Sequence, residues 1–335
     1  MNDSVKSVKK IRFGVVGTNT ISDKVIAGAL LDPRFVLTAV YSRTQAQADW
    51  FAERHAIPHT YTSLELMAES PLIDAVYIAS PNSLHASQSI LFMKHRKHVL
   101  CEKAFASNAR EVREMIAVAT KQKLVLMEAM KPTLTPNFSA VFDALPSIGK
   151  VRNYFSCYCQ YSSRYDKYKQ GVVLNAFNPA LSNGALVDIG VYTIYPMVVL
   201  FGAPKSIQAT GFKLSSGVDA QGSVTFSYDD MTATVLFSKV SDSTLPTEIQ
   251  GEEGTIWMDR INIIKEVTLS LRNGEKRVLT RHHCGEEYYY EVAEFIDLIL
   301  SGKRESLVNS HANSLITMQI LDQIRHQLGV RYPAD

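Results

Sequence analysis

The sequence predicts an α/β protein of two domains, a doubly wound parallel sheet followed by an α+β domain with a largely antiparallel open sheet. Three observations support this fold class. Over residues 11–128, short β-branched runs alternate with amphipathic stretches of helical length, which is typical of parallel strands joined by crossover helices. Beyond residue 128, alternating strands dominate, which indicates an antiparallel sheet. The chain has 335 residues, 46% hydrophobic and 20% charged, so it is long enough for two globular domains.

The first domain is predicted to span residues 1–128. Its expected strands cover residues 11–17, 36–42, 75–80, 98–101 and 124–127. Helices are expected between them, at residues 22–31, 45–55, 84–94 and 109–121. This alternation predicts a Rossmann domain.

The second domain is predicted to span residues 129–335. Its expected strands cover residues 151–161, 222–228, 232–239 and 267–272. The turn pairs Asp229-Asp230 and Asn273-Gly274 predict two hairpins among them. Helices are expected to close the chain at residues 287–300 and 311–328.

Charge and composition narrow the classes of partner. The net charge of +2 comes from 35 basic and 33 acidic residues spread along the chain, so no footprint for nucleic acid or an anionic membrane is expected. The apolar stretch at residues 192–201 is about half of the roughly 20 residues that a membrane span needs, and we expect a buried helix there. Small molecules and other protein subunits remain as expected partners.

The cysteines predict a reducing compartment and no metal centre. Four cysteines without a C-x-x-C pair do not make a disulfide framework in a chain of this length, and we expect a cytoplasmic protein. His282, His283 and Cys284 are adjacent on a predicted strand, where side chains alternate between faces, and no fourth ligand follows at zinc spacing. No metal site is therefore predicted.

The first predicted strand ends in a glycine turn that leads into a helix. Its sequence is Gly17-Thr18-Asn19-Thr20-Ile21-Ser22, where dinucleotide-binding folds carry G-x-G-x-x-G or G-x-G-x-x-A. The second glycine is replaced by Asn19, the best non-glycine residue for a positive φ, and the third by the small Ser22. We predict that residues 17–21 bind a dinucleotide; a glycine turn without a ligand is the alternative.

The residues after the second strand indicate which dinucleotide binds. An acid at this place usually holds the ribose 2′-hydroxyl of NAD, and an arginine accommodates the 2′-phosphate of NADP. Here the chain has Ser42, Arg43 and Thr44, whose guanidinium and hydroxyls suit a phosphate. NADP is therefore predicted, with NAD possible, and a solvated surface charge at Arg43 is the alternative.

Three segments in order carry a resemblance to a known family. They are AVYIASPNSLH at residues 75–85, HVLCEK at 98–103 and GALVDIGVY at 184–192. Together they strongly resemble the Gfo/Idh/MocA oxidoreductase family, and the third looks like its NADP-dependent dihydrodiol dehydrogenase branch. The resemblance implies that the turn of Ser80, Pro81 and Asn82 lies beside the nicotinamide ribose and that Lys103 lies at the reacting carbon. Ala104 stands where the family usually has a proline, which often stiffens the turn.

The chemistry that this resemblance implies requires a group that moves the hydroxyl proton when the hydride leaves. We assign proton transfer to Tyr192, whose pKa a neighbouring lysine would lower, and electrostatic stabilisation to Lys103, with the reverse assignment left open. Asp188 lies four residues before Tyr192 in an expected helix, on the same face. It is expected to bind a second hydroxyl or to orient Lys103, or else to serve as a charge at the helix N-terminus. Pro196 predicts a distortion of this helix.

Two further residues are secondary candidates for the cofactor site. His85 would lie near the cofactor in the resemblance, and a capping or packing role is an equal alternative. Glu102 is expected to anchor its turn or to touch the nicotinamide ribose.

The predicted function is hydride transfer between a nicotinamide dinucleotide and a sugar, polyol, diol or related carbonyl compound. A non-catalytic sensor of the same fold is the alternative. The resemblance also implies a homodimer or homotetramer, paired through an exposed sheet face of the second domain.

Overall fold

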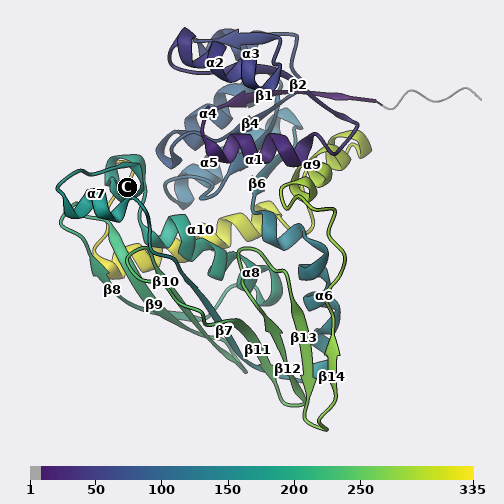
Figure 1. Ribbon diagram of the computed structural model, residues 1–335, viewed down its shortest axis with the longest axis vertical. Coiled ribbons are helices and arrows are strands. Elements are labelled where there is room, and N and C mark those ends of the chain that lie inside the picture. Colours follow the sequence, from purple (N-terminus) through teal and green to yellow (C-terminus); the bar gives the residue numbers. More distant parts are fainter. Residues whose placement is uncertain (1–8) are drawn as a thin grey trace, which may run out of the picture.

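The computed structural model describes residues 9–335 and consists of a Rossmann domain above a large open sheet, with a long helix crossing between them (Figure 1). The first sheet is parallel, in the order β3-β2-β1-β4-β5-β6. Its strands are β1 Ile11–Val16, β2 Phe35–Tyr41, β3 His59–Tyr61, β4 Ala75–Ile78, β5 His98–Glu102 and β6 Leu126–Ala129. Its helices are α1 Thr20–Ala29, α2 Gln45–His55, α3 Leu64–Glu69, α4 Asn82–Lys94 and α5 Ala109–Gln122.

The predicted strands and helices of this domain are all present. The sequence analysis missed β3 and α3, which are short and lie at the edge of the sheet. Helix starts follow local capping: the side chain of Thr44 accepts the Gln47 N–H at the start of α2, and Asn108 accepts the Glu111 N–H at the start of α5. Strand β4 is buried along its whole length, as expected of a parallel strand covered on both faces.

The second sheet is mixed but largely antiparallel, in the order β14-β13-β12-β11-β7-β10-β9-β8. The pair β7 and β10 runs parallel and the other neighbours run antiparallel. The strands are β7 Val151–Cys159, β8 Ser206–Lys213, β9 Asp219–Ser227, β10 Thr232–Ser238, β11 Thr247–Gly251, β12 Gly254–Met258, β13 Val267–Leu271 and β14 Lys276–Val278. The helices after β6 are α6 Pro136–Ala144, α7 Tyr165–Lys169, α8 Val191–Phe201, α9 Tyr289–Ser301 and α10 His311–Leu328. Both predicted hairpins are present, β9–β10 around Asp229-Asp230 and β13–β14 around Asn273-Gly274, where Gly274 has φ +89°.

Helix α9 packs on the Rossmann domain although it follows the second sheet in the chain (Figure 1). Its Val292 and Phe295 belong to the same hydrophobic cluster as Phe13 of β1. The contact is close, because a Cβ on Gly28 of α1 would lie 2.8 Å from the Tyr289 nitrogen. The proposed domain limits, 1–128 and 129–335, remain a prediction.

The segment Pro179–Phe201 is long and apolar enough to cross a membrane by length and composition, with a mean hydropathy of 1.7. Yet 72% of its most apolar window is buried inside the protein. It therefore packs as a core element, and α8 within it packs against β7 and β10 of the second sheet.

Candidate active site

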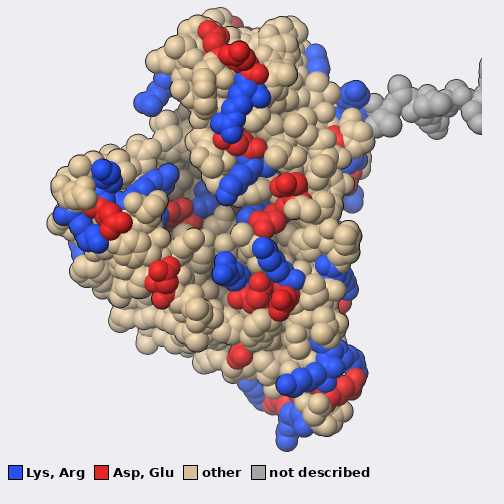
Figure 2. Space-filling view, viewed as in Figure 1, with Lys and Arg blue, Asp and Glu red and all other residues tan. Residues whose placement is uncertain are grey.

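A cavity of about 970 Å³ lies between the Rossmann domain and the second sheet, and Figure 2 shows it as a hollow flanked by both positive and negative side chains. On the Rossmann side it is lined by polar residues of the strand ends and of α1, including Asn19, Thr20, Lys24, Ser80, Asn82, His85, Glu102 and Lys103. The opposite wall includes Tyr158, Gln160, Arg164, Asn183, Asp188, Tyr192, Asp242 and Arg260, and Glu287 and Tyr288 line the cavity just before α9. The site is thus assembled at the carboxyl ends of the parallel strands, where doubly wound sheets bind ligands.

The glycine turn delivers the N-terminus of α1 to the cavity. Gly17 has φ +110°, and a Cβ there would lie 2.7 Å from the Ala79 carbonyl oxygen, so a side chain would force apart β1 and the end of β4. Thr20 and Ile21, in the first turn of α1, line the cavity. The positive end of a helix dipole favours a phosphate, so the turn fits a dinucleotide.

The predicted reason for Asn19 is wrong. Its φ is −111°, and its side chain instead caps α1 by accepting the N–H groups of Ile21 and Ser22 at 2.9 and 3.1 Å. The same side chain donates its amide N–H to the Ala79 carbonyl oxygen at 2.7 Å. Ser22 donates to the Gly17 carbonyl oxygen at 2.7 Å, so two side chains brace the turn that glycines would otherwise form.

Ser42, Arg43 and Thr44 follow β2 and do not line the main cavity. Thr44 caps α2, and Gln47 of that helix donates to the Thr18 hydroxyl at 3.2 Å. Arg43 is exposed, and within residues 9–335 it makes no ion pair. These residues therefore lie beside the glycine turn, and the exposed Arg43 guanidinium can contact a ligand bound there.

His85 joins the two strand ends at the nicotinamide side of the predicted site. It is fully buried, and its ring nitrogens lie 2.8 Å from the Ser80 carbonyl oxygen and 2.9 Å from the Ala104 carbonyl oxygen. Burial lowers its pKa to about 4, so the ring is neutral at physiological pH. Asn82, which follows the half-buried Pro81, donates to the Ser182 carbonyl oxygen at 2.9 Å. His85 and Asn82 thus hold the turn, and the packing alternative for His85 has direct support.

A hydrogen bond from Tyr77 fixes the Glu102 carboxyl group. Tyr77 of β4 donates to its Oε1 at 2.6 Å, and the carboxyl lines the cavity while only 8% exposed. Burial raises the pKa of Glu102, and the Tyr77 hydrogen bond offsets part of this rise. Its position beside Lys103 fits both predicted roles.

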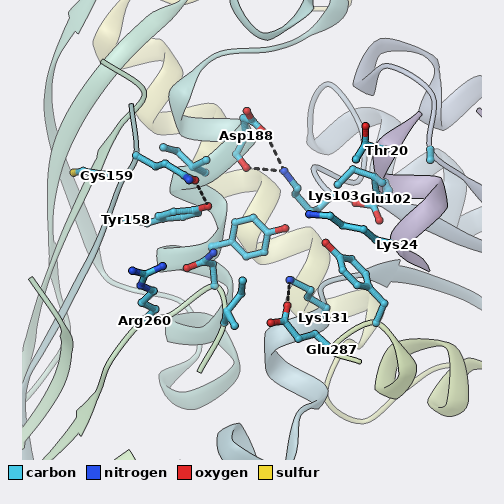
Figure 3. Close-up of a pocket in the computed structure, with 18 of the residues that line it drawn as sticks. Thr20, Lys24, Glu102, Lys103, Lys131, Tyr158, Cys159, Asp188, Arg260 and Glu287 are labelled. Carbon is cyan, nitrogen blue, oxygen red and sulfur yellow. Dashed lines mark hydrogen bonds and ion pairs between the residues drawn. The ribbon is translucent and has the colours of Figure 1, made fainter. Parts of the chain in front are cut away.

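Lys103 points across the cavity to the opposite wall (Figure 3). Its ammonium donates to the Asp188 carbonyl oxygen at 2.6 Å and to Asp188 Oδ1 at 3.0 Å, and it lies 5.0 Å from the centre of the Tyr192 ring. The peptide bond between Lys103 and Ala104 is cis. The three residues predicted to be catalytic, which come from two distant segments, therefore meet at one place.

Opposite charges decide how Lys103 and Asp188 ionise. Burial by itself would lower the pKa of Lys103, but the carboxyl groups of Asp188 and Glu102 outweigh it and the pKa is raised. Burial by itself would raise the pKa of Asp188, but Lys103 and Lys239 hold it well below its usual value. The site at neutral pH is therefore an ammonium held by a carboxylate.

Two expectations for the Asp188 segment need correction. Asp188 lies in a π turn, Leu186–Gly190, and Tyr192 lies in the following α8, so the two do not share a regular α-helical face. Asp188 and Tyr192 still line one cavity. The predicted distortion at Pro196 is not where the helix is irregular: α8 continues through Pro196, and the irregular segment is the π turn that precedes α8.

The predicted pKa of Tyr192 is also wrong in direction. Burial, followed by the charges of Glu102, Tyr158 and Asp188, raises its pKa well above the usual value of 10.0. The ammonium of Lys103 lies over the ring face, where its charge is shared with Asp188. Tyr192 is therefore a neutral phenol at physiological pH, a hydrogen-bond donor.

Several charged or aromatic residues of the site were not predicted. Lys131 pairs with Glu287 and lies 4.4 Å from the centre of the Tyr288 ring, and Lys239 pairs with Asp188. Figure 3 shows Lys24 and Arg260 also directed towards the cavity. The sequence did not single these residues out, because segments far apart in the chain bring them together at the site.

The His282-His283-Cys284 segment does not form a metal site in the described part of the chain. No group of three or more His, Cys, Asp or Glu side chains within residues 9–335 is placed to hold an ion. Cys284 is exposed, and the Cys157 and Cys159 sulfurs lie 3.7 Å apart on β7.

Fold and cavity together define the class of protein, a dinucleotide-binding oxidoreductase. Residues 11–130 match the family described as "Oxidoreductase family, NAD-binding Rossmann fold", and residues 147–257 match the GFO/IDH/MocA C-terminal domain. The chain belongs to the Gfo/Idh/MocA oxidoreductase family, as the sequence motifs predicted.

Curated relatives match over nearly the whole chain. The scyllo-inositol 2-dehydrogenase (NADP(+)) IolU of Bacillus subtilis is 50% identical, with 97% of this chain and 99% of the relative covered. A trans-1,2-dihydrobenzene-1,2-diol dehydrogenase of Danio rerio is 32% identical, with 97% and 99% covered. These relatives confirm the predicted enzyme class.

Solved structures share the fold. A 3-ketoreductase from Actinomadura kijaniata, in complex with NADP and TDP-benzene, has a TM-score of 0.83 at 25% identity, covering 96% of this chain and 98% of that one. A levoglucosan dehydrogenase has a TM-score of 0.86 at 19% identity, covering 96% and 98%. The second match shows the fold alone, and both confirm the predicted architecture.

Proposed function

We propose that this protein is an NADP-dependent dehydrogenase that transfers a hydride between the cofactor and a ring carbon of a cyclic polyol of the inositol type. The Bacillus subtilis relative is named as an NADP-dependent scyllo-inositol dehydrogenase, and this chain is 50% identical to it over nearly the full length of both proteins. This similarity supports both the cofactor and the substrate class. The mixed polar lining of the cavity suits a polyol, which needs a hydrogen-bond partner for each hydroxyl.

One observation carries this proposal: the ammonium of Lys103, held by Asp188, lies between the Rossmann strand ends and the ring of Tyr192. A group that exchanges a proton with the substrate oxygen must lie within hydrogen-bond reach of it. Asp188 leaves the Lys103 ammonium with a third N–H for that oxygen, because two are used by its carbonyl and carboxylate.

The pKa values support the reverse of the first assignment, with Lys103 as the proton-transfer group. When bound, the nicotinamide accepts or supplies the hydride at the substrate carbon. In the oxidation direction neutral Lys103 takes the hydroxyl proton, and in the reduction direction its ammonium donates a proton to the developing alkoxide. Tyr192, whose pKa is raised, remains protonated and stabilises the same oxygen by donating a hydrogen bond. Asp188 orients Lys103.

The cofactor would lie along the residues predicted for it. Gly17, Thr18, Asn19, Thr20 and Ile21 offer the helix N-terminus to the pyrophosphate, and Ser42, Arg43 and Thr44 meet the 2′-phosphate. The turn of Ser80, Pro81 and Asn82, with His85 and Glu102 behind it, supports the nicotinamide ribose. The exposed cation of Arg43 beside the glycine turn supports the choice of NADP.

We also propose a cytoplasmic homodimer or homotetramer. The half-buried side chains Phe155, Leu236 and Trp257 lie on the outer face of the second sheet, on neighbouring or near-neighbouring strands. Aromatic residues are enriched in interfaces. Light scattering that shows a monomer at micromolar concentration would contradict this assembly.

The function is tested with a substrate panel. Purified protein and NADP+ are incubated with inositol stereoisomers, trans-dihydrodiols and aldoses, and NADPH formation is followed. We expect the highest kcat/KM with an inositol, and a loss of about 1,000-fold or more in kcat for Lys103→Met, with unchanged NADPH binding. NADPH binding without turnover across the panel would support the sensor alternative and overturn the proposal.

A further inference from the structure

Asp188 lies between two lysines, of which one faces the cavity and the other does not. Lys103 contacts Asp188 Oδ1 and the second lysine, Lys239, contacts Oδ2. Lys103 lines the cavity, whereas Lys239 is absent from its lining and has a side chain only 5% exposed. The carboxylate thus separates a cation that can reach a substrate from a buried one that cannot.

We propose that Lys239 is a positioning residue for proton transfer: it fixes the Asp188 carboxylate and shares its charge, so that Lys103 is held towards the substrate and gives up its proton more readily. This inference rests on the proposed function, because it concerns the same Lys103. Nothing in the motifs of the sequence pointed to Lys239.

The backbone around Lys239 is built to hold the lysine in place. Its N–H donates to the Ala220 carbonyl oxygen at 2.9 Å, and its carbonyl oxygen accepts the Ser162 N–H at 2.9 Å. The side chain then runs past the Phe177 ring, with the ammonium 5.5 Å from the ring centre. Burying an ammonium is costly unless it is paired, and its ion-pair partner here is Asp188, whose segment also carries the reacting tyrosine.

The turn that carries Asp188 is fixed by the same part of the sheet. Asp219, at the start of β9, accepts the Leu186 N–H at 2.5 Å, and Leu186 begins the π turn. Asp219 is 1% exposed, and a Cβ on Gly184 would lie 2.3 Å from its Oδ1. The backbone of the turn is therefore held by Asp219 of β9, and the Asp188 carboxylate is held separately by Lys103 and Lys239.

The charge of Lys239 sets how strongly Asp188 retains the Lys103 proton. With two ammonium groups on one carboxylate, Lys103 meets only part of the negative charge. A second ammonium beside the same carboxylate disfavours the charged form of the first. Removal of the Lys239 charge should therefore raise the pKa of Lys103.

Other titratable groups near Lys103 come from the elements packed around it, and of these only Asp188 contacts Lys239. They are Glu102 of β5, Asp188 of the π turn, Tyr192 of α8, Tyr158 of β7, His85 of α4 and Glu128 of β6. A shift between the wild-type protein and a Lys239 variant therefore reports on Lys239 itself.

The experiment compares Lys239→Gln, Lys239→Met and Lys239→Arg with the wild-type protein. We expect Gln and Met to lower kcat about 10- to 100-fold with little change in the KM for NADP+, and to move the alkaline rise of polyol oxidation up by about one pH unit or more. Arg, which keeps the charge, should restore the wild-type pH profile. In parallel, labelling by acetic anhydride over a pH series, read by mass spectrometry at Lys103, gives the pKa of that amine without turnover.

Lys97→Met serves as the matched control. Lys97 is also a buried lysine, but its ammonium donates to the Ser70 and Ile73 carbonyl oxygens, away from the cavity. Its loss should reduce thermal stability and leave the pH profile of Lys103 unchanged. If Lys239→Met does not fold, Lys239→Gln, which retains a hydrogen-bond donor, provides the same comparison.

Two results would overturn the inference. In the first, the Gln or Met variant is folded and shows the wild-type kcat and wild-type labelling pKa of Lys103, so that Lys239 only stabilises the loop after β10. In the second, Arg fails to restore the profile. Absence of turnover in the wild-type protein would instead refute the proposed function, and the labelling measurement would still decide the role of Lys239.

Discussion

Buried carboxyl groups on the two sides of the cleft ionise differently according to whether a cation lies beside them. On the Rossmann side, behind the cavity lining, Glu128 of β6 and Glu291 of α9 are buried and make no ion pair within residues 9–335, and burial raises the pKa of Glu128 to about 8 and that of Glu291 well above its usual value. On the second-sheet side, Asp188 lies between two ammonium groups, which hold its pKa below the usual value despite burial. The difference follows from the presence of cations rather than from the depth of burial.

This contrast distinguishes residues that affect the pH dependence of folding stability from residues that affect the rate of the reaction. A neutral buried acid stabilises the fold only at pH values where it keeps its proton, whereas a compensated ion pair keeps its geometry over the whole physiological range. Substitutions on the Rossmann side should therefore alter the pH dependence of folding or cofactor binding. Substitutions on the opposite wall should alter turnover.

The largest effect is expected from Glu128→Gln, measured as the free energy of unfolding in urea at pH 6 and pH 9. The folded-state pKa of Glu128 is about 8, against 4.5 for the free group, so the folded protein retains a proton that the unfolded chain loses. The stability that this proton confers is fully present below about pH 4.5 and is lost as the pH rises through 8. Between pH 6 and 9 the wild-type protein should lose about 3 kcal/mol through this residue, and the variant should not.

Exposed Glu114, substituted by Gln, is the control and should retain the wild-type loss of stability with pH. If Glu128→Gln shows the same loss as the wild-type protein, Glu128 is not the protonated acid that distinguishes the Rossmann side.

The second effect tests the opposite wall. Tyr192→Phe removes one hydrogen-bond donor to the substrate oxygen, and we expect kcat to fall about 100-fold, or about 2.7 kcal/mol, with little change in stability. Tyr195→Phe is the matched control, because the Tyr195 hydroxyl lies 3.1 Å from the Ser314 hydroxyl and away from the cavity. Equal kcat values for both variants would remove Tyr192 from the reaction.

The smallest effect concerns the choice of cofactor. Arg43→Ala should raise the KM for NADP+ about 10-fold, since one charge-assisted contact is worth roughly 1.5 kcal/mol, and should leave the KM for NAD+ unchanged. Arg54→Ala, at the other end of α2, is the control. A similar rise for both cofactors would indicate that Arg43 supports the glycine turn instead of the 2′-phosphate.

Much of the fold was predictable because its signals are local. Alternating buried runs and helical stretches predicted the parallel strands, and the turn pairs at residues 229–230 and 273–274 predicted both hairpins. The parallel pairing of β7 with β10 and the packing of α9 on α1 were not predictable. They depend on contacts between segments far apart in the chain, which leave no periodic pattern in either segment.

The sequence by itself determined the family to which the chain belongs, and its motifs singled out Lys103, Asp188, Tyr192 and the turn at Gly17 as candidates for the site. Only the tertiary structure decided their ionisation and their support. Asn19 caps a helix instead of adopting a positive φ, Tyr192 is held neutral by burial, and Lys239 reaches Asp188 from the loop after β10. The physical reason is that pKa values and ion pairs depend on burial and on distances between atoms, and these are fixed only when the two walls of the cleft come together.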